Sequence, residues 1–404
     1  MSAAKPLRIH FPQKQIDVIL ARVRAYPWGD MPQIPKDAPH RWIYGTDMEY
    51  LKELCAYWVD GYDWRQCEAR LQQFDHRKAD IQGLGVHYIL ARSANPKARW
   101  LLLTHGWPGS VLEFLDVLDP LANPQKHGGA LEDGIHVVCP SLPGYGFSDK
   151  PSAPLGPRSV AAMWDELMRT VIGAPDYIAQ GGDWGAITSS FLGLRHAAPK
   201  AGGCAAIHLN MLGLRPTDFA PRTDDERAWF GKAAAVAEAE TAYLRLQATK
   251  PQTLSYAMMD SPVGACAWIV EKFHGWGDLR AGTHTPKKAE PKGADIERAF
   301  SKDFLLSNVM LYLLTETFGT ASWIYRGLFE EGGPVMPEGE TVTVPTGIAN
   351  FADPFMDFPP RSMVERGYRI VHWQDYDRFG HFAALEAGPV FVREVQQFVR
   401  QLKG

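Results

Sequence analysis

The sequence is poor in cysteine, in surplus positive charge and in long apolar runs. Five cysteines are scattered over 404 residues without a Cys-x-x-Cys pair or zinc-ligand spacing, which is typical of buried thiols in a reducing compartment. Lys and Arg number 42 against 46 Asp and Glu, a net charge of −4 that argues against nucleic acid or an anionic membrane as partner. No stretch approaches the ~18 apolar residues of a membrane span, and residues 1–8 lack the apolar run of a signal peptide. These absences favour a soluble, cytoplasmic protein.

The composition that remains is that of an ordinary globular protein. Hydrophobic residues make up 46% of the chain and charged residues 22%, which excludes a disordered or fibrous chain. At roughly 100–200 residues per domain, the length fits two domains or one large domain with an insertion.

Short apolar runs alternate with helical patterns before residue 212. Runs of this kind are typical of parallel strands that are buried on both faces and covered by helices. We therefore predict an α/β fold with a mostly parallel central sheet, whose first strands occupy residues 100–104, 135–139, 176–180 and 205–209.

The alternation is then interrupted by a long helical stretch. Strand patterns return only at 341–345 and 368–373, before a final helix that begins at Gly388. The first ninety residues are rich in Trp and Tyr, show helical patterns with few clean strands, and are expected to pack on a neighbour. The predicted organisation is an N-terminal meander at 1–80 and an α/β core in two parts, at 81–212 and 341–404. A helical lid at 213–340 separates the two parts of the core.

The sharpest motif is GGDWG at 181–185, between a predicted strand and a predicted helix. It matches the nucleophile elbow G-x-S-x-G of α/β-hydrolases, with Asp183 in place of the serine. The turn projects the central side chain to a helix N-terminus, where free N–H groups and the helix dipole keep a carboxylate ionised. An Asp that merely caps the helix is the structural alternative.

A second motif, HGWP at 105–108, ends the first clear core strand. In α/β-hydrolases the loop at this place supplies one oxyanion-hole N–H, and the residue after the nucleophile supplies the other. The candidate donors are therefore the backbone N–H groups of Trp107 and Trp184.

Hydrolases of this fold place nucleophile, acid and histidine in that order along the chain. His381 lies in a loop after the last predicted strand, whereas His372 lies inside that strand and is expected to be structural. Asp353 and Asp357 both follow the strand at 342–347. We prefer Asp353 as the acid because it is closer to the strand end; Asp375 and Asp377 share the loop of the histidine and are less favoured.

With these residues in place, the chain resembles an epoxide hydrolase of the microsomal type, an α/β-hydrolase fold with an N-terminal meander and a helical lid. The resemblance covers nearly the whole length. Its most specific part is the lid segment at 242–273, because the lid is not shared with other hydrolases of the fold. The other matching pieces are HGWPGS at 105–110, SLPGYGFSDKP at 141–151, GGDWG at 181–185, NVMLY at 308–312 and GHFAALE at 380–386.

The resemblance implies a role for each candidate. Asp183 would be the nucleophile, His381 the base and Asp353 the charge partner, while Tyr243 and Tyr325 of the lid would activate the epoxide. The chain departs from its relatives in two places: Phe379 stands where many have Gly, and the spacing of 28 between Asp353 and His381 is a residue longer than expected.

The chemistry agrees with these roles. A carboxylate can open an epoxide by in-line displacement, and the resulting Asp alkyl ester can be hydrolysed by a water that His deprotonates. Tyr hydroxyls can donate a hydrogen bond to the leaving alkoxide at neutral pH without themselves ionising. The resemblance implies a small apolar epoxide as substrate, no cofactor, no metal, no nucleic acid and no membrane anchor, and it is compatible with a homodimer.

Three alternatives are less favoured. A haloalkane dehalogenase uses the same Asp-Trp elbow and histidine but has no use for a tyrosine pair. A non-catalytic binding protein of this fold would typically have lost the nucleophile or the base. An esterase would need Ser at the elbow, whereas Ser189 and Ser190 lie inside the following helix.

Overall fold

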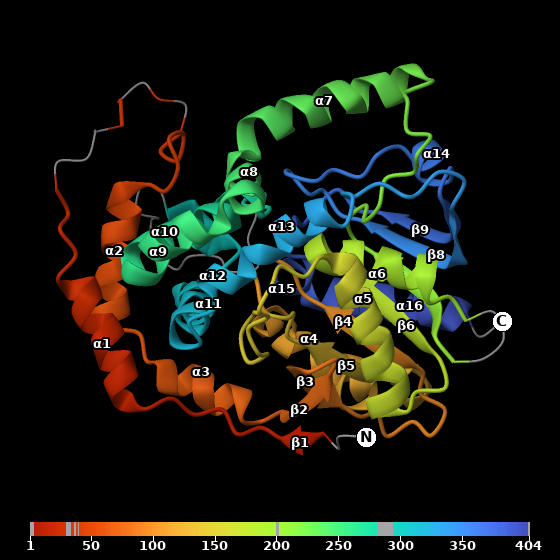
Figure 1. Ribbon diagram of the computed structural model, residues 1–404, viewed down its shortest axis with the longest axis horizontal. Coiled ribbons are helices and arrows are strands. Elements are labelled where there is room, and N and C mark those ends of the chain that lie inside the picture. The colour runs from red at the N-terminus through yellow and green to blue at the C-terminus, as the bar shows by residue number, and fades with distance from the viewer. Residues whose placement is uncertain are drawn as a thin grey trace.

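A nine-stranded sheet forms the centre of the computed structural model, which describes residues 4–29, 34–35, 38, 40–198, 202–280 and 294–402 (Figure 1). The strand order is β1-β2-β3-β5-β4-β6-β7-β8-β9. From β5 to β9 all neighbours pair in parallel, whereas β1, β2, β3 and β5 pair antiparallel. The strands are β1 (Lys5–Pro6), β2 (Asp75–Ile81), β3 (Leu84–Ala91), β4 (Trp100–Thr104), β5 (His136–Pro140), β6 (Tyr177–Gly181), β7 (Cys204–Leu209), β8 (Val342–Asn350) and β9 (Tyr368–Asp375).

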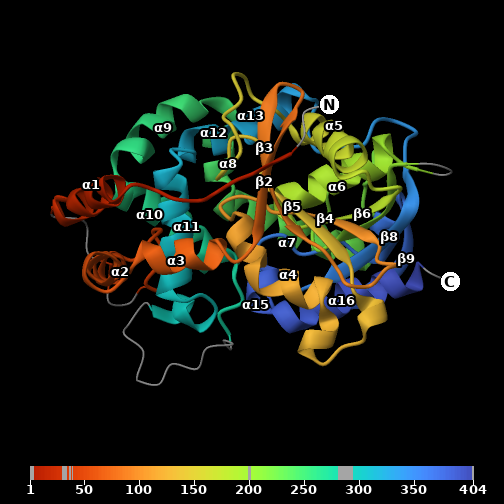
Figure 2. The same ribbon diagram turned by 90° about the horizontal axis from the view of Figure 1, so that it is seen from below.

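The middle strands are apolar because helices cover both of their faces. Every residue of β6 is buried, and so is every residue of β4 except Trp100. In Figure 2, α5 (Pro157–Glu166) and α6 (Asp183–Arg195) lie on one face of the sheet, and α4 (Leu115–Ala122) and α16 (Gly388–Gln401) on the other. The predicted α/β fold with a mostly parallel sheet is confirmed.

One hairpin was not predicted. We expected few strands in the first ninety residues, but β2 and β3 form an antiparallel hairpin that extends the sheet. β2 alternates between buried and exposed positions and carries charged side chains, so it lacks the continuous apolar run of the central strands. Its turn consists of Gln82 and Gly83, both with positive φ, which is the backbone geometry of a tight hairpin.

The helical insertion between β7 and β8 covers the carboxyl end of the sheet. Thr223, Ser261 and Ser301 cap three of its helices through their side-chain oxygens, which satisfies backbone N–H groups that a helix start leaves free. The helices are α7 (Asp224–Glu240), α8 (Ala242–Thr249), α9 (Pro251–Asp260), α10 (Pro262–Trp276), α11 (Lys302–Leu314), α12 (Phe318–Ala321) and α13 (Trp323–Glu330).

The N-terminal helices pack on this lid rather than on the sheet. Figures 1 and 2 show α1 (Gln13–Arg24), α2 (Met48–Asp60) and α3 (Trp64–Leu71) beside α10 and α11. The Tyr57 hydroxyl donates to Asp303 Oδ1 at 2.8 Å, and Thr46 Oγ1 donates to the Ala267 carbonyl at 2.7 Å. The N-terminal segment therefore supports the lid from outside. Within the described ranges, no helix combines the length and apolar character that crossing a bilayer requires.

Candidate active site

Asp183 stands at the sharp turn between β6 and α6. Its φ is +45°, an uncommon conformation for a non-glycine residue and one that concentrates at functional sites. The turn leaves no room for larger neighbours. A Cβ on Gly181 would lie 2.2 Å from the carbonyl carbon of Gly185, and a Cβ on Gly185 would lie 2.0 Å from the Thr104 carbonyl oxygen. The two glycines of the motif are thus required by close backbone approach, and the geometry is that of the predicted elbow.

The loop after β4 lies directly against this carboxylate. The Trp107 N–H donates to Asp183 Oδ1 at 2.8 Å, and a Cβ on Gly106 would lie 2.2 Å from the same oxygen. Trp184 is the second residue of α6, where backbone N–H groups have no partner within the helix. The structure therefore brings one predicted donor to the carboxylate, and the role of the Trp184 N–H stays a prediction.

His381 lies between two carboxylates. Its Nδ1 is 2.7 Å from Asp353 Oδ2, and its Nε2 is 3.6 Å from Asp183 Oδ2. Asp353 is oriented by its own turn, because its other oxygen accepts the N–H groups of Phe355 at 2.8 Å and Met356 at 3.0 Å. Burial alone would lower the pKa of His381, but attraction to Asp353 and contact with Asp183 raise it to about 10.

The other candidate residues have partners elsewhere. Asp357 accepts from Lys232 Nζ at 2.6 Å near the surface, and Asp375 accepts from Asn350 Nδ2 at 2.7 Å. His372 is buried and lies 2.5 Å from Glu394 Oε1, which confirms that it is a structural histidine. Of the four candidates for the acid, Asp353 is the one in contact with His381.

The two lid tyrosines reach the same place from different helices. Tyr243 of α8 stacks on Trp107 with ring centroids 5.1 Å apart, and Tyr325 of α13 meets Trp184 edge to face at 4.5 Å. Burial raises the pKa of both hydroxyls well above the usual value, and the nearby charge of Asp183 raises them further. Both tyrosines are therefore protonated at neutral pH.

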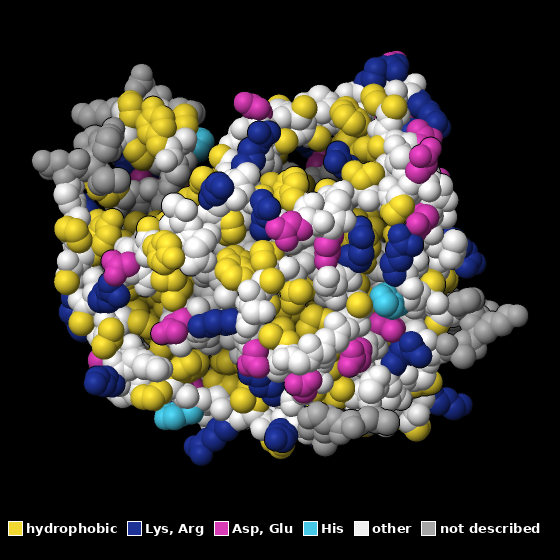
Figure 3. Space-filling model, in the orientation of Figure 1, with side chains coloured by type: hydrophobic (Ala, Val, Ile, Leu, Met, Phe, Trp, Pro, Cys, Tyr) yellow, Lys and Arg dark blue, Asp and Glu magenta, His cyan; other side chains and the backbone are white. Residues whose placement is uncertain are grey.

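Asp183 and the tyrosine pair open into an apolar cavity of about 420 Å³. The cavity lies between α7 and the carboxyl end of the sheet, where Figure 3 shows the surface hollowed and lined by hydrophobic side chains. Such a volume fits a small organic molecule. Its apolar walls include Ile187, Met211, Leu212, Phe219, Trp229, Phe230, Val236, Leu244, Leu328, Phe355 and Met356.

Two buried acids near the site were not identified from the sequence. Glu386 accepts the N–H groups of Asp278, Gly380 and Phe382 and thereby holds the loop of His381. Glu113 is buried close to Asp183, and burial raises its pKa to about 8. Glu386 ends the GHFAALE motif and Glu113 lies shortly after the HGWPGS motif, but the sequence alone does not show that either points inward. Among the described residues, no cluster of three His, Cys, Asp or Glu side chains could hold a metal ion.

Comparison with known proteins places this geometry in a family. The family model described as "Epoxide hydrolase N terminus" matches residues 4–114, and the model described as "alpha/beta hydrolase fold" matches residues 99–236. A putative epoxide hydrolase of Stigmatella aurantiaca is 38% identical over 98% of this chain and 85% of its own. Epoxide hydrolase 1 of Sus scrofa is 30% identical over 99% of this chain and 89% of its own.

Solved structures of epoxide hydrolases resemble this chain as well. The Aspergillus niger epoxide hydrolase superposes with a TM-score of 0.81 at 28% identity, covering 99% of this chain and 96% of that one. The juvenile hormone epoxide hydrolase of Bombyx mori also gives 0.81 at 28% identity, covering 100% and 96%. The chain therefore belongs to the epoxide hydrolases, a family of hydrolases, and joins an epoxide hydrolase N-terminal region to an α/β-hydrolase fold.

Proposed function

We propose that this epoxide hydrolase converts a small apolar epoxide and water into a vicinal diol through a covalent ester on Asp183. The observation that carries the proposal is the convergence of one carboxylate, one histidine and two tyrosine hydroxyls where the sheet meets the lid. The apolar walls of the cavity support an apolar substrate, because they offer few partners to a charged or strongly polar one.

In the first step, Asp183 Oδ2 attacks an epoxide carbon while Oδ1 stays with the Trp107 N–H. The carbon–oxygen bond of the ring breaks, and the epoxide oxygen takes a proton from Tyr243 or Tyr325. Their raised pKa keeps the proton available until negative charge moves from Asp183 to the epoxide oxygen. The tyrosines thus stabilise charge where it develops.

Formation of the ester also changes His381. The charge of Asp183 is one of the causes that raise the pKa of the imidazole in the free enzyme, and esterification removes that charge. The pKa of His381 then falls, and the proton that it releases restores the tyrosine hydroxyl that gave its proton to the alkoxide. A neutral imidazole held by Asp353 is the form that can deprotonate water for the second step.

In the second step, water attacks the ester carbonyl of Asp183. The negative charge develops on Oδ1, beside the Trp107 N–H and, in our proposal, the Trp184 N–H. His381 takes one proton from the water and gives it to the departing oxygen as the ester bond breaks, which releases the diol. The other water proton then passes from the Asp183 carboxyl group to His381, which restores the carboxylate.

The function is tested by incubating the purified protein with styrene oxide and, separately, with 1-bromobutane. We expect phenylethanediol from the first and no halide from the second, because a tyrosine pair protonates an alkoxide and is of no use to a halide. Halide release without diol formation would contradict the proposal and favour a dehalogenase.

We also propose a cytoplasmic location. The five cysteines are free thiols, four of them buried, which suits a reducing compartment. Fractionation of the source cells should recover the protein with the cytosol, and recovery in a membrane or secreted fraction would contradict this.

A further inference from the structure

A second, smaller cavity shares one wall with the apolar cavity, and that wall is Asp183. Its volume is about 20 Å³, enough for one water molecule. Among the residues that the structure describes, Asp183 alone lines both cavities. The nucleophile therefore separates the space for a substrate from a space for a single water.

Three polar atoms around this small cavity are buried and lack a hydrogen-bond partner. They are His381 Nε2, Thr104 Oγ1 and Gln180 Oε1, none of which hydrogen-bonds to any described residue. Buried polar atoms are almost always satisfied by protein or by ordered water. A water in the cavity would satisfy them and would lie beside both Asp183 and His381.

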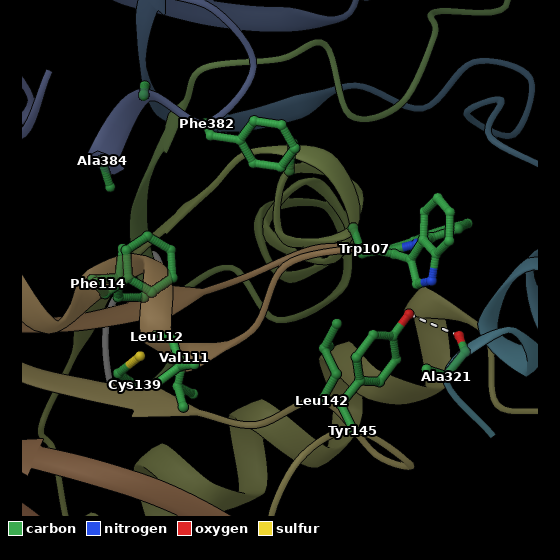
Figure 4. Close-up of a cluster of buried hydrophobic side chains, with 14 of the residues drawn as sticks. Trp107, Val111, Leu112, Phe114, Cys139, Leu142, Tyr145, Ala321, Phe382 and Ala384 are labelled. Atoms are coloured by element: carbon green, nitrogen blue, oxygen red, sulfur yellow. Dashed lines mark hydrogen bonds between the residues drawn. The ribbon is translucent and has the colours of Figure 1, made fainter. Parts of the chain in front are cut away.

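Glu113 also lines the small cavity. Glu113 belongs to a short 3-10 helix (Val111–Phe114) that Ser110 caps by accepting the Leu112 N–H. Gly109 makes room for it, since a Cβ there would lie 1.4 Å from Glu113 Oε1. Figure 4 shows Phe114, Phe382 and Ala384, three apolar residues that line the same cavity.

Glu113 is suited to bind a water molecule without placing a second negative charge beside Asp183. Burial raises the pKa of Glu113 to about 8; attraction to His381 opposes this rise, and the charge of Asp183 adds to it. The carboxyl group is therefore mostly neutral at pH 7 and offers one O–H donor and one carbonyl acceptor. It adds no second negative charge next to Asp183.

We propose that Glu113 is a water-positioning residue, which holds the hydrolytic water in the small cavity against His381 Nε2 and the carboxyl carbon of Asp183. The proposal rests on the function given above and adds a residue to its second step. The water oxygen bonds to the Asp183 carbon, one proton passes to His381, and the other O–H stays bonded to the Glu113 carbonyl. The ester bond then breaks, and His381 gives its proton to the departing diol. The second water proton, left on the new Asp183 carboxyl group, passes to His381 and restores the carboxylate.

The test separates ester formation from ester hydrolysis. Single turnovers with styrene oxide are quenched at intervals, and the covalent adduct is followed by intact-protein mass. In Glu113→Leu we expect adduct formation within about threefold of the wild type and adduct decay slowed by about tenfold or more. Glu113→Gln keeps a carbonyl at the same place, so its decay should stay within about threefold of the wild type.

Three controls keep the outcome decisive. Val117→Ala, in the adjoining helix α4 and away from the cavity lining, should leave both steps unchanged. If Glu113→Leu does not fold, Glu113→Asp retracts the carboxyl group by one methylene and should show the same selective slowing of decay. Wild-type decay in whichever of these two variants folds, or an equal loss in both steps, would overturn the proposal. His381→Gln tests the proposed function separately, because it should accumulate adduct whatever the role of Glu113.

Discussion

The sheet and the lid each supply part of the site, and they hold their residues by different forces. Asp183, His381 and Asp353 follow sheet strands and are fixed by directional hydrogen bonds and ion pairs. Tyr243 and Tyr325 come from lid helices and are fixed by ring packing on Trp107 and Trp184. In the mechanism proposed above, the core residues form and cleave the ester, whereas the lid residues protonate an alkoxide. The comparison suggests that the core sets the reaction and the lid selects the epoxide.

The largest loss of activity should come from substituting the nucleophile of the core. Asp183→Asn replaces the attacking oxygen with an amide, so we expect diol formation to fall by at least about four orders of magnitude. Formation of diol from styrene oxide measures the loss, and no covalent adduct should be detected. Asp357→Asn is the matched control, since that carboxylate bonds Lys232 instead. Substantial turnover by Asp183→Asn would remove the nucleophile from the mechanism.

The second-largest effect should separate ester formation from ester hydrolysis. His381→Gln keeps the nucleophile but removes the base, so the ester should form and then decay about a thousandfold more slowly. Intact-protein mass after one turnover should show the protein plus one epoxide. A variant that neither turns over nor gains mass would contradict the covalent route.

The third effect should decide between the two candidate acids. Asp353→Ala removes the partner of His381 Nδ1, and we expect adduct decay to slow by roughly a hundredfold or more. Its pH profile should also move to lower pH, because the attraction that raises the pKa of His381 is lost. Asp357→Ala should behave as the wild type. The reverse result would mean that the acid is Asp357.

A smaller effect should appear when the lid is altered alone. Tyr243→Phe and Tyr325→Phe each remove one proton donor, so we expect adduct formation to slow by about ten- to a hundredfold while decay is unchanged. Rapid-quench measurements of both steps check this. Slower decay with normal formation would show that the division of labour between lid and core is wrong.

The same contrast explains what could be predicted from the sequence. Asp183 and His381 could be found because the elbow imposes glycines at fixed places and the fold imposes chain order. Asp353 and Asp357 could not be separated on the same basis, since both follow β8. What orients Asp353 toward His381 is a turn whose Phe355 and Met356 N–H groups bind one carboxyl oxygen.

Other features depended on packing that a linear pattern does not show. The hairpin of β2 and β3 was missed because β2 carries charge on its exposed positions. Glu113 lies in a stretch that reads as the start of an ordinary helix, and it faces inward only because Gly109 leaves room for its carboxyl group.

The smallest effect should come from the unusual residue beside His381. Phe379 has a φ of +70°, a conformation that costs a bulky residue about 1–2 kcal/mol and costs glycine little. Phe379→Gly relieves that strain but gives up packing against Phe351 and adds freedom to the unfolded chain. We expect the free energy of unfolding to change by less than about 1 kcal/mol.

Phe379→Val is the matched comparison, because a β-branched side chain tolerates positive φ worst. It should destabilise by about 2 kcal/mol in urea titrations. In both variants the ester should decay at the wild-type rate, because Glu386 holds the loop through the Gly380 and Phe382 N–H groups. If decay slowed in Phe379→Gly, the backbone at 379 would be positioning His381, and hydrogen bonding alone would not account for the rigidity of the core.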